Sequence, residues 1–114
     1  MTLVVKEDTE SGIAILNVTG RLDSNTASDL EPTLFERTRN EAAVLLDMQA
    51  VPYISSAGLR VLLGAAKIAR ATGTRLALCG LAPQVHEVLQ LSGFARAFET
   101  FGTRADVMDA MSAT

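Results

Sequence analysis

Two adjacent serines, Ser55 and Ser56, stand between an apolar strand pattern and an amphipathic helix pattern. The apolar run 43–46 is short and ends at Asp47, which is typical of a strand covered on both faces. After the serines the apolar residues follow a helical spacing, at Leu59, Leu62, Leu63 and Ala66. The two hydroxyls are therefore predicted at the helix N-cap or one residue outside it, where they can accept from unpaired N–H groups of the first turn.

Two kinds of chemistry are open to these hydroxyls. A capping role only stabilises the helix, and local sequence alone favours it because serine is among the preferred N-cap residues. Alternatively, one hydroxyl accepts a phosphate, which free N–H groups and the positive end of the helix dipole would stabilise without unfolding the domain. Such a modification would change the charge of a surface and leave the fold intact, as a reversible binding switch requires.

Three short segments carry a resemblance to a known family. They are residues 20–27 (GRLDSNTA), 46–59 (LDMQAVPYISSAGL) and 91–94 (LSGF). In this order and spacing, and in a chain of this length, they resemble the STAS family, the sulphate transporter and anti-sigma factor antagonist domains. The resemblance is to the small stand-alone antagonist branch, and it covers nearly the whole chain.

The resemblance also implies a site. In the family pattern the phosphorylated serine lies two residues before a Gly-Leu pair, and that position here is Ser56. Ser55 occupies a position that is commonly Asp, and it is the second candidate for the modification. The small residues at 57 and 58 are expected to let a partner's backbone approach closely. The expected partner-binding residues are Asp23, Ser24, Asn25, Ser55, Ser56, Ala57 and Gly58.

The function implied by the resemblance is that of an anti-sigma factor antagonist in a partner-switching pathway. The unphosphorylated form would bind an anti-sigma factor that is also an ATP-dependent serine protein kinase, and would thereby release a sigma factor. Phosphorylation at Ser56 would end binding, and a serine phosphatase would restore it. An alternative is a non-switching STAS accessory subunit of a lipid transporter or scaffold complex, with Ser56 only a cap. A further alternative keeps partner switching but controls secretion or motility.

The remaining patterns predict an α/β fold with a mostly parallel sheet, an N-terminal hairpin edge and about four helices. Asp23, Ser24 or Asn25 should cap the first helix, in which Pro32 predicts a kink or a separate initial turn. Asp47 and Asp23 are expected to accept backbone N–H bonds. The predicted strands cover 3–6, 13–19, 43–48, 75–80 and 98–101, and a turn at 8–12 joins the first two. After the first helix, three more helices are predicted: one at 57–72 that ends at Gly73, one that begins at Pro83 and one around 107–111.

Length and composition narrow the class of protein. With 114 residues the chain is expected to be a single STAS domain spanning 1–114. It is 48% hydrophobic but has no run long enough for a membrane span, and its start lacks a signal-peptide pattern, so no membrane insertion and a cytoplasmic location are expected. A net charge of −3 and 4% aromatic residues argue against direct nucleic-acid binding. Arg60, Lys67 and Arg70 are interpreted as a solvated helix face.

Catalysis is not expected. The only histidine, His86, has no spacing that would place it beside the serines, and these lack the Gly-x-Ser-x-Gly pattern of α/β hydrolases. One cysteine, Cys79, and one histidine do not make a zinc site, so no metal or cofactor is predicted. Cys79 lies in an apolar strand pattern and is expected in the core. A receiver domain phosphorylated at Asp47 is disfavoured, because the acidic pair and the lysine of such domains are missing.

Overall fold

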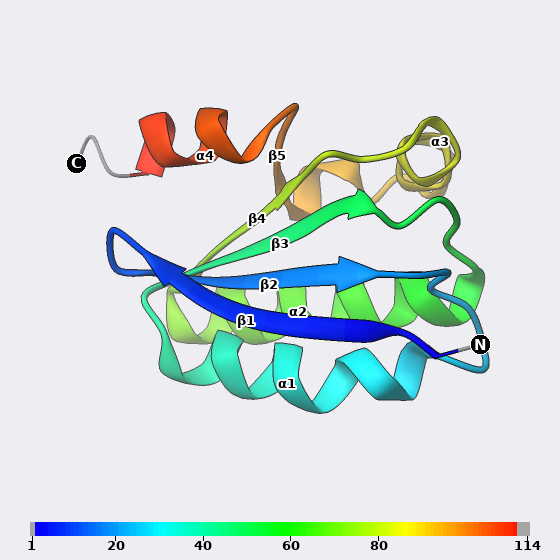
Figure 1. The fold of residues 1–114 in the computed structure, drawn as a ribbon, viewed down its shortest axis with the longest axis horizontal. Helices are drawn as coiled ribbons and strands as arrows, with labels where there is room; N and C mark the ends of the chain where they lie inside the picture. Colours follow the sequence, from blue (N-terminus) through cyan, green and yellow to red (C-terminus); the bar gives the residue numbers. More distant parts are fainter. Residues whose placement is uncertain (1, 112–114) are drawn as a thin grey trace.

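The computed structural model describes residues 2–111. Five strands form one sheet in the order β1-β2-β3-β4-β5, in which β1 is antiparallel to β2 and all other neighbours are parallel (Figure 1). This confirms the predicted mostly parallel sheet with a hairpin at its edge. The strands are β1 (Val4–Glu10), β2 (Ile13–Thr19), β3 (Ala43–Ala50), β4 (Arg75–Cys79) and β5 (Glu99–Phe101).

The hairpin turn is shorter than predicted. Only Ser11 and Gly12 connect the strands, and their φ angles of 53° and 78° are those of a two-residue type I′ turn. The polar residues before the turn, predicted as loop, instead continue β1 to Glu10. They can do so because β1 is an edge strand whose carboxylates meet cations. The Arg104 guanidinium donates to Asp8 at 3.0 Å and to Glu10 at 2.9 Å.

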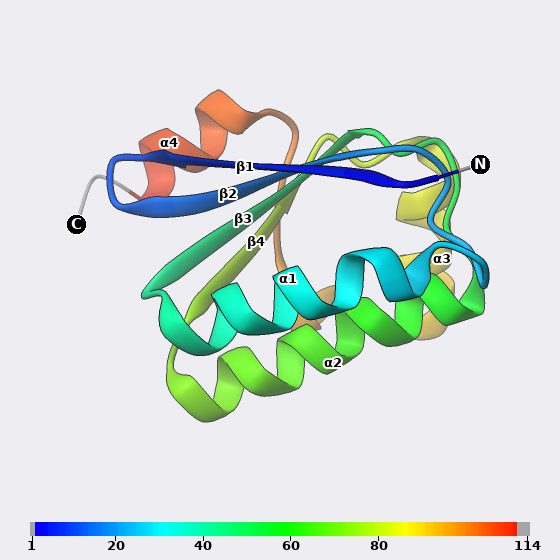
Figure 2. The same cartoon turned by 60° about the horizontal axis from the view of Figure 1, so that its bottom comes forward.

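Helices cover both faces of the sheet. α1 (Ala27–Asn40) and α2 (Ser56–Thr72) pack side by side on one face, and α4 (Arg104–Met111) lies on the other (Figures 1 and 2). α3 (Pro83–Ser92) lies at the end where β2 and β3 finish, and the short 3-10 helix η1 (Ala95–Ala97) follows it. The predicted four helices are therefore all present.

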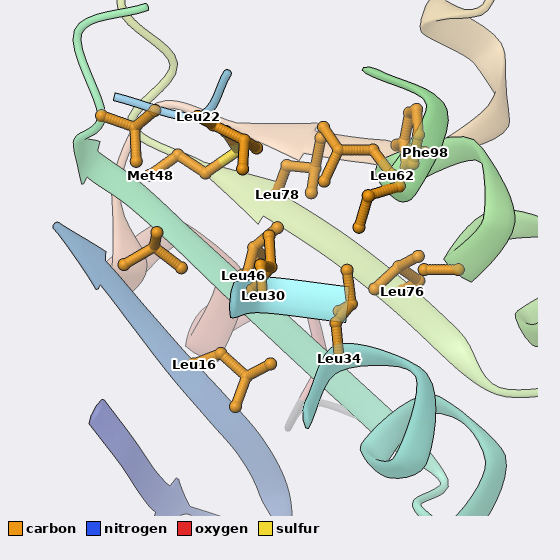
Figure 3. Close-up of a cluster of buried hydrophobic side chains, with 14 of the residues drawn as sticks. Leu16, Leu22, Leu30, Leu34, Leu46, Met48, Leu62, Leu76, Leu78 and Phe98 are labelled. Carbon is orange, nitrogen blue, oxygen red and sulfur yellow. The ribbon is translucent and has the colours of Figure 1, made fainter. Parts of the chain in front are cut away.

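Alternating side chains of the central strands divide the core into two. Leu46 of β3 is buried with α1 and α2, whereas its neighbour Leu45 is buried with α4. This confirms that β3 is covered on both faces. The larger cluster joins strand residues to helix residues, as Figure 3 shows for Leu16, Leu22, Leu30, Leu34, Leu46, Met48, Leu62, Leu76, Leu78 and Phe98.

Of the two alternatives predicted at Pro32, the separate initial turn is wrong, because α1 continues through this residue from Ala27 to Asn40. The kink stays a prediction. Proline removes the bond to the carbonyl four residues earlier, that of Ser28, but both residues are exposed and water can satisfy this carbonyl. The N-cap is Thr26, not one of the three residues 23–25, and its side chain makes no capping bond.

Other local expectations are confirmed. α2 ends at Gly73, whose φ of 76° is left-handed and whose N–H donates to the Ala69 carbonyl. Asp47 accepts the Gln49 backbone N–H at 3.1 Å. Cys79 is buried in the core, where burial and the neighbouring Asp47 carboxylate raise the pKa of its thiol to about 12. This thiol is therefore neutral at physiological pH and packs as a small apolar residue.

Candidate functional site

Two loops far apart in the sequence meet at the end of the sheet where β2 and β3 finish. The loop after β2 leads into α1 and the loop after β3 leads into α2 (Figures 1 and 2). Leu22 and Ile54 form an isolated parallel bridge between them. The Leu22 N–H donates to the Tyr53 carbonyl at 3.0 Å, and the Ser55 N–H donates to the Leu22 carbonyl at 2.9 Å. The two predicted site segments therefore form one continuous surface.

Gly58 makes this junction possible. A Cβ at this position would lie 2.7 Å from the Leu22 carbonyl oxygen and 2.9 Å from the Ile54 side chain, so only glycine fits beneath the bridge. Gly58 is buried, so contacts within the chain already explain why glycine is needed here, and the close approach of a partner's backbone stays a prediction. Its part in the site is to let the start of α2 pack against the Leu22 loop. Ala57 beside it is half-buried and remains at the surface.

The two serines have different roles in the structure. Ser55 is the N-cap of α2, and its hydroxyl accepts the Gly58 N–H at 3.3 Å. Ser56 is the first residue of the helix, so the expectation that it caps or precedes the helix is wrong. Its side chain is exposed, and no residue within 2–111 hydrogen-bonds to its hydroxyl. Ser55 thus supplies the stabilising cap, and Ser56 presents a free hydroxyl to solvent.

The Asp23 carboxylate organises the neighbouring loop, as expected. Its Oδ1 accepts the backbone N–H groups of Asn25 at 2.9 Å and Thr26 at 3.2 Å. The Thr26 hydroxyl donates to the Arg21 carbonyl at 2.6 Å and ties the loop at its base. These bonds form an Asx-type turn that leaves Ser24 and Asn25 exposed. The loop therefore enters the site with its backbone already ordered.

Three residues near the site, Arg21, Tyr53 and Gln84, were given no role of their own in the sequence analysis. The Arg21 guanidinium lies over the Tyr53 ring, 4.2 Å from its centroid, and so adds a contact between the loops. The Gln84 amide accepts the Ile54 N–H at 2.9 Å and donates to the Ile54 carbonyl at 3.1 Å. Each contact joins residues 30 or more positions apart. Arg21 and Tyr53 lie in two of the segments that the sequence pattern singled out, whereas Gln84 lies outside all three.

Gln84 is expected to hold the loop before α2 in place. In Gln84→Ala both backbone groups of Ile54 lose their partner, which should cost about 1–3 kcal/mol and raise the exchange rate of the Ile54 amide about tenfold or more. Hydrogen exchange followed by NMR measures this rate. Gln90→Ala removes an exposed glutamine from the same helix and serves as the matched control. An unchanged Ile54 exchange rate in Gln84→Ala would contradict this role.

The electrostatic setting of Ser56 suits an added negative charge. The first turn of α2 contains no acidic residue. Arg60 lies one helical turn further on, and the helix N-terminus contributes its own positive potential. A phosphate on the Ser56 hydroxyl would therefore be tolerated by the folded chain itself.

Other kinds of site were sought in the described chain. Within residues 2–111 there is no group of three or more His, Cys, Asp or Glu side chains that could hold a metal ion. His86 is exposed on α3. None of the helices described combines the length and apolar character required to cross a bilayer.

The geometry defines a class of protein, an α/β domain that presents a serine at a helix start beside an ordered loop. The same fold is found in an anti-sigma factor antagonist from Thermotoga maritima, with a TM-score of 0.86, 20% identity, and coverage of 93% of this chain and 92% of that one. The Bacillus cell fate determinant SpoIIAA in its phosphorylated form superimposes with a TM-score of 0.73 at 15% identity, covering 94% and 98% of the two chains.

Sequence comparison gives the family. The STAS domain matches residues 5–107, and the chain therefore belongs to the STAS domain family. It is 40% identical over 98 residues to the anti-sigma factor antagonist BtrV of Bordetella bronchiseptica, an alignment that covers 85% of this chain and 84% of that protein. This confirms the resemblance seen in the three sequence segments.

Proposed function

We propose that this protein is an anti-sigma factor antagonist that works by partner switching. In its unphosphorylated form it binds an anti-sigma factor that is also a serine kinase, and the sigma factor is released. The kinase transfers the γ-phosphoryl group of ATP to the Ser56 hydroxyl, binding ends, and a serine phosphatase hydrolyses the phosphoester. The similarity to BtrV, which carries the name of an anti-sigma factor antagonist, supports the general role.

The observation that carries the proposal is the position of Ser56. It is exposed, its hydroxyl is free of bonds to residues 2–111, and it stands at the first position of a helix whose cap is a different residue. A kinase can therefore reach the hydroxyl without disturbing the fold. Ser55 is less suited, because its hydroxyl is half-buried and accepts the Gly58 N–H.

Serine at position 55 is compatible with this proposal. The family pattern commonly has aspartate there, and aspartate and serine are both strong N-cap residues. The Ser55 hydroxyl makes the bond to Gly58 that a carboxylate could make. The departure from the pattern thus keeps the cap and removes one negative charge beside Ser56.

The surface around Ser56 would be the contact with the kinase. The partner-binding residues proposed are the exposed or half-buried ones, namely Asp23, Ser24, Asn25, Ser55, Ser56 and Ala57. In the unmodified protein these side chains are small and, apart from Asp23, uncharged. A phosphate placed among them would have to be desolvated without a matching cation from the partner, which is unfavourable by several kcal/mol.

Phosphorylation of serine variants tests the proposal. Wild-type, Ser55→Ala and Ser56→Ala chains are incubated with ATP and a lysate of the native cell, and intact-protein mass spectrometry follows the addition of a phosphoryl group. Wild type and Ser55→Ala are expected to gain one group, and Ser56→Ala none, because its hydroxyl is missing. Labelling of Ser56→Ala together with loss of labelling in Ser55→Ala would move the site to Ser55. Absence of labelling in every chain would contradict the switch.

A further inference from the structure

A groove of about 850 Å³ runs between α2 and the segment that connects α3 to β5. Phe94 lines it and is 47% exposed, and Leu91, which is 80% exposed, lies three residues earlier and outside the lining. An exposed aromatic side chain at an apolar concave surface is typical of a binding site for another molecule. The apolar lining consists of Leu63, Ala66, Ala69, Leu76, Phe94, Ala97 and Phe98.

The groove is basic although the chain as a whole carries a net charge of −3. Among the described residues that line it, the one acidic residue is Glu99, whose carboxylate accepts from Arg75 Nη2 at 2.6 Å and from Arg75 Nε at 3.0 Å. The other basic residues of the lining make no ion pair with any residue in 2–111. They are Arg60, Lys67, Arg70 and Arg96.

The composition of α2 reinforces this asymmetry. The helix has three basic residues and no acidic one, in a chain with 13 acidic residues. Lys67 and Arg70 are three positions apart on one helix face, a spacing at which like charges repel. No acidic residue of α2 lies at this spacing from either of them to offset the repulsion. An acidic partner would remove the repulsion.

This groove is continuous with the phosphorylation site proposed above. Ser56, Arg60, Leu63, Lys67 and Arg70 follow at intervals of four, three, four and three residues, and therefore lie along one stripe of α2. The wall of the groove begins one helical turn after Ser56. It extends for about 15 Å between positions 60 and 70, the length of roughly three helical turns.

The geometry points to an acidic amphipathic helix of the anti-sigma factor as the occupant of this groove, an inference that rests on the proposed function for the identity of the partner. The apolar face of this helix would cover Leu63 and Phe94. Its carboxylates would pair with the four unpaired basic residues named above, which form the rim of the groove. A small anion with a single charged group would engage only one end of the rim. The cations are instead spread along the wall formed by α2 and on the opposite wall at Arg96, which suits an extended acidic segment.

A synthetic peptide tests the groove without the kinase. The probe is an acidic helix of about 14 residues with leucine on one face and glutamate on the other, titrated into the isotope-labelled, unmodified chain. Amide shifts in NMR spectra are expected at residues 60–70 and 94–98, and none at the Ser11 hairpin. A double variant with Lys67→Glu and Arg70→Glu should raise the Kd for the peptide about tenfold or more, because attraction at the rim becomes repulsion.

A matched control distinguishes the contribution of the groove to peptide binding from the effect of a change in net charge. The pair Lys6→Glu and Arg39→Glu makes the same charge change at exposed sites outside the groove and should keep the peptide affinity. The inference would be overturned if both double variants lowered the peptide affinity equally, or if the amide shifts were centred outside the groove. It would also be overturned if a peptide with the same residues in scrambled order bound equally well. So would concentration-dependent shifts of residues 60–70 without peptide, which would identify a second copy as the occupant. Since no phosphorylation enters this experiment, its failure is distinct from failure of the switch at Ser56.

Discussion

Ser56→Asp is expected to weaken binding of the anti-sigma factor about a hundredfold or more while the chain keeps its stability. The loss corresponds to about 3 kcal/mol, the order expected when a charge is buried in an interface without a partner. The melting temperature should stay the same or rise by at most about 5 °C, because aspartate in the first turn interacts favourably with the helix dipole. Isothermal titration calorimetry and thermal unfolding measure the two quantities.

The separation of these two effects follows from the roles of the two serines. Ser55 caps α2, whereas the Ser56 side chain is exposed and makes no bond within the described chain. A substitution at Ser56 therefore leaves every hydrogen bond of the site in place. The binding effect would arise only from charge at the surface shared with residues 23–25.

A matched variant controls for the added charge. Ser11→Asp introduces one negative charge at the hairpin turn, at the end of the sheet away from the site (Figure 1). Ser11 is exposed, and aspartate tolerates its left-handed backbone, so Ser11→Asp should bind the partner as the wild type does. A Ser56→Asp protein that binds at full strength would refute the switch, and one that unfolds would show that Ser56 is structural.

Gly58→Val is expected to lower the free energy of unfolding by about 3 kcal/mol or more, one of the largest single effects open to this chain. The first added carbon would already lie 2.7 Å from the Leu22 carbonyl oxygen and 2.8 Å from Leu22 Cγ. Since these atoms belong to a buried residue and its backbone, α2 or the Leu22 loop must move. Urea unfolding measures the loss, and the melting temperature should fall by roughly 10–20 °C.

Two further variants show whether crowding is the cause. Gly58→Ala should destabilise less than valine, because it adds one carbon and gains up to about 1 kcal/mol in helix propensity. Ala71→Val places valine at an exposed position of the same helix and should cost only a few tenths of a kcal/mol. A Gly58→Val protein as stable as Ala71→Val would mean that α2 and the Leu22 loop are not tightly packed.

Local patterns in the sequence were sufficient for much of the fold. The apolar run of β3, the helical spacing of α2 and the left-handed end at Gly73 all depend on neighbours within a few residues. The choice of N-cap for α1 was wrong, although the interaction that decides it is also local. Asp23 has the right chemistry for a cap, but its carboxylate is used by its own turn, and the helix starts at Ala27.

Distant contacts account for what the sequence analysis missed. Pro32 breaks helices in isolation, yet α1 continues through it because packing of Leu30 and Leu34 in the core holds both sides of the helix. Gly58 has an ordinary appearance in a serine- and alanine-rich segment. Its function as a contact point for Leu22 depends on a residue 36 positions earlier, which no local pattern can reveal.

By itself, the sequence determined the α/β class, the order of the elements, the family and the pair of serines at the start of α2, because these follow from periodicity, turn chemistry and short motifs. Only the tertiary structure decided which serine is the cap and which is free, since that depends on the exact start of the helix. It also decided that the Leu22 and Ile54 loops form one surface and that the basic side of α2 faces Phe94. These are long-range contacts, and the cooperative packing of the whole core sets their geometry.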